Sequence, residues 1–230
     1  MASGENRPGN RNIHLPGWTC RLPAPCTGSK GSWRIMQSLM LRSFIAVEIP
    51  TEIQNAIAHS LASLQKALPK PLIRWVALQN VHLTLKFLGD VSPANLERLA
   101  EVLKIEASAH DVFSMTVGDL GAFPNSRRAR VVWIGLDAPP SLATLHRGME
   151  AASATLGYAT EDRPFSPHLT VGRVGQNASV TDLHKIHEAL SATKVGYLGT
   201  VQVKAIHIFK SELRPGGSVY TQLYAMPLKI

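Results

Sequence analysis

Residues 82–85 read HLTL and residues 168–171 read HLTV. The order histidine, apolar, threonine, apolar thus occurs twice, and the two histidines are 86 residues apart. In a β-strand, residues i and i+2 share a face. Each copy therefore predicts a strand that carries an imidazole and a hydroxyl on one face and two apolar side chains on the other.

The sequence around the two copies alternates between strand-like and helix-like patterns. Strands are predicted at 41–49, 73–76, 81–89, 113–120, 129–136, 167–174, 201–213 and 218–228. Helices are predicted at 51–68, 93–107, 140–156 and 180–190, with Thr51, Ser92 and Thr181 as their candidate caps. Neighbouring strands joined by short turns favour an antiparallel sheet with helices packed on it, which is an α+β fold.

Strict alternation makes further predictions for the first copy. It places Phe87 on the apolar face, opposite His82, and it places Lys86 on the same face as His82. Lys86 could then touch a bound phosphate, although a solvated strand residue is the favoured interpretation.

Two histidines and two threonines in one place suit the chemistry of a phosphoryl group. A neutral histidine can deprotonate an attacking water and a protonated one can protonate a leaving alkoxide, each worth roughly 10²–10⁴-fold in rate. The hydroxyls of Thr84 and Thr170 can donate to phosphate oxygens, and no metal is required. A zinc site is a rival interpretation, but it usually needs three protein ligands and only His82 and His168 are supplied.

The composition favours an anionic partner. The 230 residues suffice for one medium domain or two small lobes, and the 24 basic against 16 acidic residues give a formal net charge of +8. No apolar run approaches the ~20 residues that span a bilayer. Cys20 and Cys26 are the only cysteines, in a C-x5-C spacing that indicates neither a disulfide framework nor a CxxC metal pair. We therefore expect a protein of the reducing cytoplasm.

Residues 1–39 are rich in Gly, Pro, Ser, Asn and Arg and show neither helical nor strand periodicity. They are predicted to be a disordered basic extension, followed by one two-lobed domain at 40–230. An inert tail, a mis-assigned start and, less favoured, a transit peptide are the alternatives for this segment. A translation start at Met36 or Met40 would place the ordered sequence directly after the first methionine.

Three segments carry a resemblance to a known family. MLRSFIAVEIP (40–50), RWVALQNVHLTLKFLGDV (74–91) and FSPHLTVGRV (165–174) resemble the two-histidine phosphoesterase superfamily, and within it the bacterial RNA 2′,3′-cyclic phosphodiesterases, also called 2′-5′ RNA ligases. The resemblance covers residues 40–230. It implies a bilobal α+β fold in which two lobes of antiparallel sheet, related by a pseudo-twofold axis, have helices outside and a central cleft between them.

The same resemblance implies an activity and a set of site residues. The family hydrolyses an RNA 2′,3′-cyclic phosphate to a 2′-phosphate without metal or other cofactor, and 2′-5′ ligation is the same chemistry reversed. His82 matches the proton donor to the departing 3′ oxygen, and His168 matches the base that activates water. Thr84 and Thr170 match the positions that hold the phosphate. Arg173 matches the family's basic residue five places after the second histidine. Strict alternation places Arg173 on the strand face opposite to that of His168, so a twist or a strand end is needed to turn its side chain toward the site.

Other residues and functions rank lower. Arg127, Arg128 and Arg130 could steer an RNA end, and Phe44, Trp75 and Trp133 could stack a base, but a solvated loop and core packing are the favoured interpretations. The alternative function is a nucleotide or RNA-end binding module with little turnover. The expected partners are RNA ends or small cyclic-phosphate nucleotides, with no membrane, and the expected state is a monomer.

Overall fold

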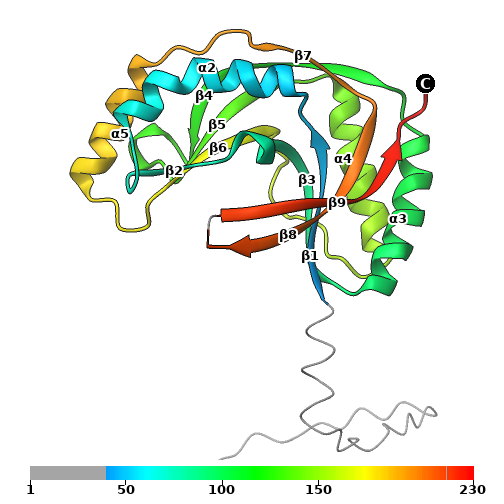
Figure 1. Ribbon diagram of the computed structural model, residues 1–230. Helices are drawn as coiled ribbons and strands as arrows, with labels where there is room; N and C mark the ends of the chain where they lie inside the picture. The colour runs from blue at the N-terminus through cyan, green and yellow to red at the C-terminus, as the bar shows by residue number, and fades with distance from the viewer. Residues whose placement is uncertain (1–39, 216) are drawn as a thin grey trace, which may run out of the picture. The chain divides into compact units, whose positions relative to one another are not determined.

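Nine strands and four helices form the part of the chain that the computed structural model describes, residues 40–215 and 217–230 (Figure 1). The predicted extension at 1–39 lies outside these residues. The strands are β1 (Leu41–Glu48), β2 (Ile73–Trp75), β3 (His82–Val91), β4 (Phe113–Phe123), β5 (Val131–Asp137), β6 (His168–Val174), β7 (Gly199–Val203), β8 (Ala205–Arg214) and β9 (Gly217–Pro227). The helices are α2 (Thr51–Ala67), α3 (Pro93–Ser108), α4 (Pro140–Ala154) and α5 (Val180–Ala192), with short 3₁₀ turns η1 (Leu78–Asn80) and η2 (Ser126–Arg128).

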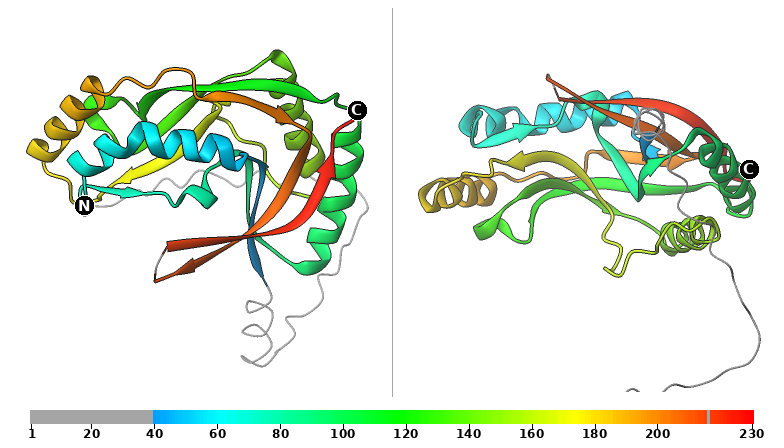
Figure 2. Two further views of the ribbon diagram at one scale, coloured as in Figure 1. Left: turned by 45° about the horizontal axis from the view of Figure 1, so that its top comes forward. Right: turned by 90° about the horizontal axis from the view of Figure 1, so that it is seen from below.

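One curled antiparallel sheet joins two lobes, which confirms the predicted α+β class. Its strand order is β7-β4-β5-β6-β3-β1-β8-β9, and β2 pairs with β6 beside β3. Helices α2 and α5 lie with the lobe of β4, β5, β6 and β7, while α3 and α4 pack on the lobe of β1, β3, β8 and β9 (Figures 1 and 2). The helices thus cover the outside of each lobe, as expected.

The lobes meet where β3 lies against β6. Their single ladder pair is Leu83 with Leu169, and both side chains are buried. In an antiparallel pair this register sets His82 opposite Thr170 and Thr84 opposite His168. The pairing of two apolar residues on one face therefore brings all four polar side chains together on the other.

A β-bulge falls at the last residue of each copy of the motif. Ala46 pairs with Thr84 and Ile45 with Lys86, so Leu85 is the extra residue of β3. In β6 the same irregularity leaves Val171 extra, between Thr170 and the next paired residue. A bulge sets two residues against one, so it reverses the alternation of the residues that follow.

The bulges correct three predictions. Phe87 is 63% exposed and lies on the face of His82, whereas Lys86 is 2% exposed and points to the buried side. Arg173, five residues after His168, returns to the face of that histidine. The bulge, rather than a strand end, turns the Arg173 side chain to the face of His168. Strict alternation gave the wrong face because it takes no account of an inserted residue.

Two of the three predicted helix caps were wrong. Pro50 precedes α2, and Thr51 makes no side-chain cap hydrogen bond. In α5 the cap is Ser179, whose hydroxyl and backbone form a capping box with Asp182, so Thr181 lies inside the helix. Ser92 is confirmed as the cap of α3, because its Oγ accepts from the backbone N–H of Asn95 at 3.3 Å.

The strand predicted at 201–213 is two strands. β7 ends at Val203 and pairs with β4, whereas β8 begins at Ala205 and pairs with β1 and β9. The break at Lys204 carries the chain from one end of the strand order to the other lobe. The apolar alternation changes phase at this break, since Val201 and Val203 are buried before it and Ile206 and Ile208 after it. The prediction of one continuous strand overlooked this change of phase, which is the local trace of the change of partner.

The core runs through both lobes as one cluster of buried apolar side chains. The predicted apolar stripe of α2 is confirmed, since Ile53, Ile57, Leu61 and Leu64 are all buried. A smaller cluster of Phe44, Ala46 and Phe209 lies apart from the main core. None of the described helices is long and apolar enough to cross a membrane.

Candidate active site

A cleft of about 620 Å³ opens on the face shared by the two motif strands. All five residues predicted for the site line it: His82, Thr84, His168, Thr170 and Arg173. The structure therefore brings together the side chains that the two copies of the motif supply, from β3 in one lobe and β6 in the other.

Both histidine rings are fixed by the same local contact. His82 Nδ1 lies 2.7 Å from the carbonyl oxygen of Asn80, and His168 Nδ1 lies 2.8 Å from that of Ser166. A carbonyl oxygen can only accept, so Nδ1 carries the hydrogen in each ring. The Nε2 atom of each histidine is left to exchange a proton.

Aromatic rings hold the two imidazoles further. His82 stacks on Phe44 at a centroid distance of 4.8 Å and meets the edge of Tyr220 at 5.2 Å. His168 meets Phe123 edge-on at 4.9 Å. Phe44 is buried, as predicted, but its ring belongs to the small cluster beside the cleft and not to the main core. These contacts restrict the rotation of both imidazoles, which favours a preorganised site.

The charges of the cleft act on His82. Burial lowers the pKa of His82 below its ordinary value of 6.5, the hydrogen bond to the Asn80 carbonyl opposes this, and the charges of Arg173 and His168 lower the pKa further. An anion bound among these groups would offset the last two effects and raise the pKa of His82.

The cleft is basic and carries hydroxyl groups. Thr84 and Thr170 are half-buried, and Arg42, Arg163 and Arg173 line the walls. The nearest carboxylate to Arg163 among the described residues is Glu161, at 3.6 Å. Cationic walls around two threonine hydroxyls suit a small anion such as a phosphate.

Lys86 takes no part in the cleft, so both interpretations of it from the sequence were wrong. Its Nζ donates to Glu150 Oε2 at 2.6 Å and to the carbonyl oxygen of Ala159 at 2.7 Å. Its side chain is 1% exposed and that of Glu150 10% exposed. The bulge at Leu85 turns Lys86 inward, where it forms a buried ion pair with α4.

This ion pair anchors the segment that leads to His168. The backbone N–H of Glu161 donates to Glu150 Oε2 at 3.1 Å, beside the contact of Lys86 with Ala159. The same segment carries Arg163 and the Ser166 carbonyl that holds His168. The first lobe therefore fixes the approach to the histidine of the second.

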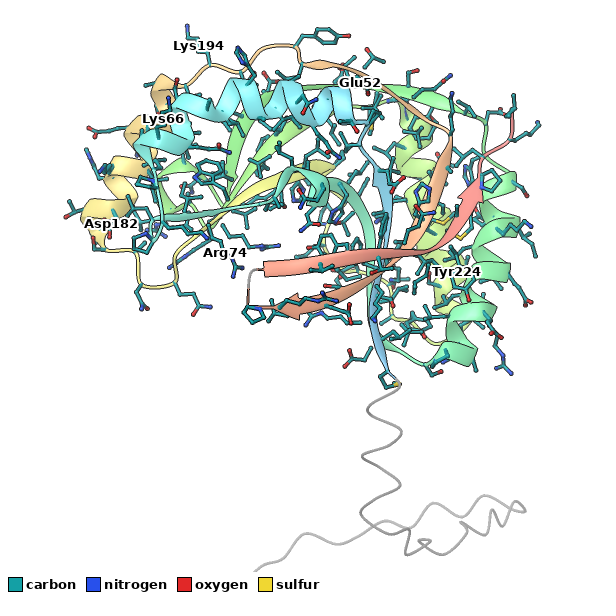
Figure 3. The ribbon with its side chains drawn as sticks, viewed as in Figure 1. Glu52, Lys66, Arg74, Asp182, Lys194 and Tyr224 are labelled. Atoms are coloured by element: carbon teal, nitrogen blue, oxygen red, sulfur yellow. The ribbon has the colours of Figure 1, made fainter. Side chains whose placement is uncertain are left out.

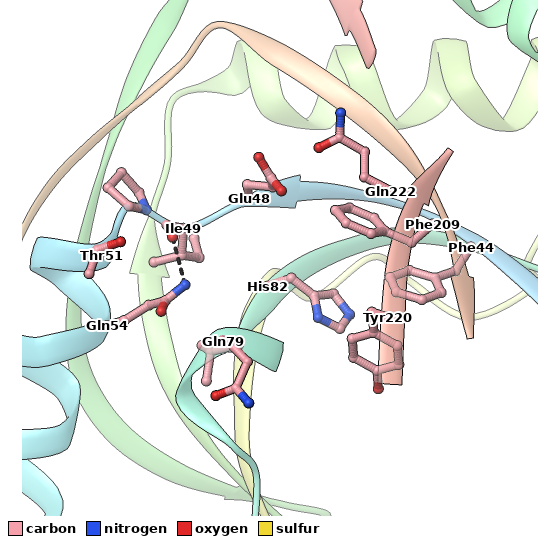
Figure 4. Close-up of a pocket in the computed structure, with 12 residues that line it drawn as sticks. Phe44, Glu48, Ile49, Thr51, Gln54, Gln79, His82, Phe209, Tyr220 and Gln222 are labelled. Atoms are coloured by element: carbon pink, nitrogen blue, oxygen red, sulfur yellow. Dashed lines mark hydrogen bonds between the residues drawn. The ribbon is translucent and has the colours of Figure 1, made fainter. Parts of the chain in front are cut away.

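A second hollow of about 500 Å³ adjoins the cleft and shares Phe44, His82 and Tyr220 with it (Figure 4). Its polar lining includes Glu48, Thr51, Gln54, Gln79 and Gln222, and none of the lining residues in the described part of the chain is a lysine or arginine. The Nε2 group of Gln54 donates to the carbonyl oxygen of Ile49 at 2.9 Å. The positive charge around His82 thus lies on the side of the cleft.

Several cleft residues were missed in the sequence. Phe87 and Arg173 both stand five places after a motif histidine, so aligning the two copies would have indicated Phe87. Arg163, five places before His168, has no such signal, since the equivalent place before His82 is Ala77. Tyr220 arrives from the β8–β9 hairpin and has no such signal.

The other residues considered in the sequence analysis lie outside the cleft. Trp75 packs against the core and its Nε1 donates to the Leu68 carbonyl, as predicted. Trp133 packs on Phe123, and its buried Nε1 has no hydrogen-bond partner within the described chain. Arg127, Arg128 and Arg130 are exposed and do not line the cleft. No group of three or more His, Cys, Asp or Glu side chains that could hold a metal ion occurs in the described ranges.

Two lobes, each with one His-x-Thr strand facing a common cleft, define a two-lobed phosphoesterase. A family model described as LigT like Phosphoesterase matches the chain twice, over residues 47–133 and 134–220, so that each match contains one motif. The chain belongs to the LigT-like phosphoesterase family.

Individual relatives agree with this assignment. The RNA 2′,3′-cyclic phosphodiesterase of Methanothermobacter thermautotrophicus is 30% identical over 185 residues, which cover 80% of this chain and 97% of that protein. That of Escherichia coli is 31% identical over 183 residues, which cover 79% and 93%. The crystal structure of Escherichia coli LigT complexed with 3′-AMP matches with a TM-score of 0.65 at 29% identity, covering 82% of this chain and 98% of LigT.

Proposed function

We propose that the protein hydrolyses RNA 2′,3′-cyclic phosphate ends to 2′-phosphate ends by acid–base catalysis without a metal. The observation that carries the proposal is the pair of histidines in one cleft, each with its Nδ1 held by a carbonyl and its Nε2 available. The relatives named RNA 2′,3′-cyclic phosphodiesterase support the choice of substrate.

In the proposed reaction, His168 Nε2 accepts a proton from a water molecule as the water oxygen forms a bond to phosphorus. The bond from phosphorus to O3′ breaks, and its electron pair goes to O3′. His82 Nε2 donates its proton to that oxygen. The product carries a 3′-hydroxyl and a 2′-phosphate, and each histidine ends in the protonation state from which the other began.

The remaining residues stabilise charge on the phosphate. The Thr84 and Thr170 hydroxyls donate to its non-bridging oxygens, and the Arg173 guanidinium offsets their negative charge. The bound anion also raises the pKa of His82 toward the value that a proton donor needs at neutral pH, because it offsets the charges of Arg173 and His168.

In the proposed scheme the same site could also carry out 2′-5′ ligation. If the 5′-hydroxyl of a second RNA replaces water, His168 deprotonates it and the departure of O3′ leaves a 2′-5′ phosphodiester. Water in excess favours hydrolysis over this reaction.

The test is hydrolysis of a short RNA that ends in a 2′,3′-cyclic phosphate, in excess EDTA. We expect the wild type to form a 2′-phosphate end, and His82→Ala and His168→Ala each to lower kcat by about 10²–10⁴-fold. Strict dependence on an added divalent ion would contradict the proposal. A wild type that binds the RNA but does not turn it over would instead favour a binding module.

A further inference from the structure

Arg74 stands directly across the sheet from Arg173. Arg74 is the middle residue of β2, and its Cα partner in β6 is Arg173. The partner of Arg173 on the other side is Val131 of β5. Side chains that are directly opposite in an antiparallel pair lie on one face, with Cβ atoms about 5 Å apart.

The neighbours of Arg74 show which face it occupies. Ile73 is fully buried, and the Trp75 ring packs against the core with its Nε1 bonded to the Leu68 carbonyl. A Cβ on Gly172 would lie 2.8 Å from Ile73 Cγ2, so this face of β2 packs tightly on β6. Arg74 therefore lies on the opposite face, with Arg173 and Val131, which line the cleft.

Arg74 itself is exposed and extends the basic wall of the cleft. It does not line the cleft proper, but its side chain reaches from β2 toward the β8–β9 hairpin (Figure 3). Within the described residues, no carboxylate oxygen lies within 4.0 Å of the guanidinium of Arg74 or of Arg173. Like charges directly opposite on neighbouring strands are destabilising. A ligand with two negative charges would offset that cost.

The topology indicates which part of an RNA lies there. β2 and β3 both pair with the same edge of β6, so Arg74 and His82 are on one side of His168. In the proposed reaction the departing O3′, and hence the nucleoside, lies at His82. The RNA chain continues from the 5′ oxygen of that nucleoside, where the next phosphate stands.

We propose that Arg74 binds the phosphate on the 5′ oxygen of the terminal nucleotide, while Arg173 binds the cyclic phosphate. This inference rests on the proposed function and adds the substrate class: an oligonucleotide end is preferred to a cyclic mononucleotide with a free 5′-hydroxyl. Arg74 is a binding residue for the RNA backbone and does not touch the reacting atoms.

Three substrates test the proposal: cytidine 2′,3′-cyclic phosphate, the same compound with a 5′-phosphate, and a trinucleotide with a 2′,3′-cyclic end. We expect Arg74→Gln to raise KM roughly fivefold for the second and third substrates, and less than twofold for the first, with kcat little changed. The slope of log kcat/KM against log salt concentration for the trinucleotide should fall by about 0.7, the loss of one phosphate contact to a single strand.

Arg98→Gln is the matched control, since Arg98 is an exposed arginine on α3, a helix of the other lobe. It removes the same charge and should leave all three KM values within about twofold. An equal effect of Arg74→Gln on all three substrates, or no effect on the trinucleotide, would overturn the assignment.

A binding measurement separates this inference from the proposed function. The affinity of wild type and Arg74→Gln is measured for a trinucleotide that ends in a 2′-phosphate and for cytidine 2′-phosphate. A selective loss of trinucleotide affinity supports Arg74 as a backbone contact even if no substrate is turned over. Equal loss for both ligands, or none, counts against Arg74 whatever the activity.

Discussion

At the scale of single residues, the cleft is built around two imidazoles whose tautomer is set by their surroundings. His82 and His168 each donate Nδ1–H to a carbonyl two residues earlier in the chain, from Asn80 and Ser166. The backbone thus sets the tautomer locally. The charges that tune His82 come from Arg173 and His168 in the second half of the chain.

Replacing Arg173 with Gln should raise the pKa of His82 in the free protein, because the nearby positive charge disfavours the protonated ring. The measurement is an NMR titration of the His82 ring proton in wild type and variant. Arg98→Gln should leave the titration unchanged. An unchanged His82 pKa in Arg173→Gln would show that the guanidinium does not act on this ring.

The pH dependence of turnover should differ between free and bound enzyme. The proposed role of His82 as proton donor requires a protonated ring, so the rate should fall as pH rises through the pKa of His82. In kcat/KM this limb reports the free protein, where the pKa lies below 6.5. Bound phosphate raises that pKa, so the alkaline limb of kcat should lie at higher pH. The pH profiles of both parameters check this, and coincident limbs would contradict it.

At the scale of elements, the two bulges decide which side chains reach the cleft. Leu85 and Val171 are inserted at the same position of each copy, so Phe87 and Arg173 occupy equivalent places on β3 and β6. The same irregularity sends Lys86 inward to Glu150. The single residue inserted in β3 therefore turns Phe87 into the cleft and turns Lys86 toward Glu150, where it anchors the segment before β6.

Lys86→Met should destabilise the protein by about 3–5 kcal/mol, because it leaves the buried Glu150 carboxylate without its cationic partner. The Oε1 atom of Glu150 already lacks a hydrogen bond within the described chain, and His146 Nε2 lies 3.8 Å from it. Urea unfolding measures the change.

The double variant Lys86→Met/Glu150→Met is the control for the buried charge. It should recover most of the lost stability, since an apolar pair of similar size often replaces a buried ion pair without cost. Its kcat should be lower than that of the wild type, because the contacts that hold Ala159 and Glu161, upstream of His168, are gone. A double variant with wild-type kcat would show that this segment needs no anchor.

At the scale of the whole molecule, the two halves of the chain exchange helices. α2 follows β1 but contacts β7 and α5, and α4 follows β5 but contacts β3 and α3. Each lobe therefore contains elements from both halves of the chain, and one core runs through both lobes. We expect the lobes to unfold together, because each is built from both halves of the chain and they share one core.

The molecule should lose stability as pH falls below neutral. Burial is the main cause that lowers the pKa of His82, His146 and His207 below 6.5. Between the lowered values and 6.5 the unfolded chain binds more protons than the folded protein, so the free energy of unfolding rises with pH in that window. Unfolding by urea at pH 7 and at pH 5 measures the loss. His146→Gln should reduce the pH dependence, and an unchanged dependence would exclude His146 as a source.

Particular residues show which structural features could be predicted from the sequence. Ile53, Ile57 and Leu61 repeat at helical spacing, and the resulting helix was predicted almost to its ends. Thr181 was predicted as the cap of the helix at 180–190, but the cap is Ser179, because helix ends are less sharply defined in the sequence than helix interiors. The segment 201–213 changes the phase of its apolar alternation next to Lys204, which marks the break, but the strands that pair with each half are set by long-range contacts.

The sequence by itself determined the local features of this protein: the helical stripes, the alternating strands and the two copies of His-x-Thr. These follow from periodicities of a few residues, which the chain carries wherever it lies. Only the tertiary structure decided that Leu83 pairs with Leu169, that Lys86 is buried against Glu150, and that Arg74 stands beside Arg173. Such contacts join residues 64 to 99 positions apart, so they depend on strand register and inserted residues that no local pattern specifies.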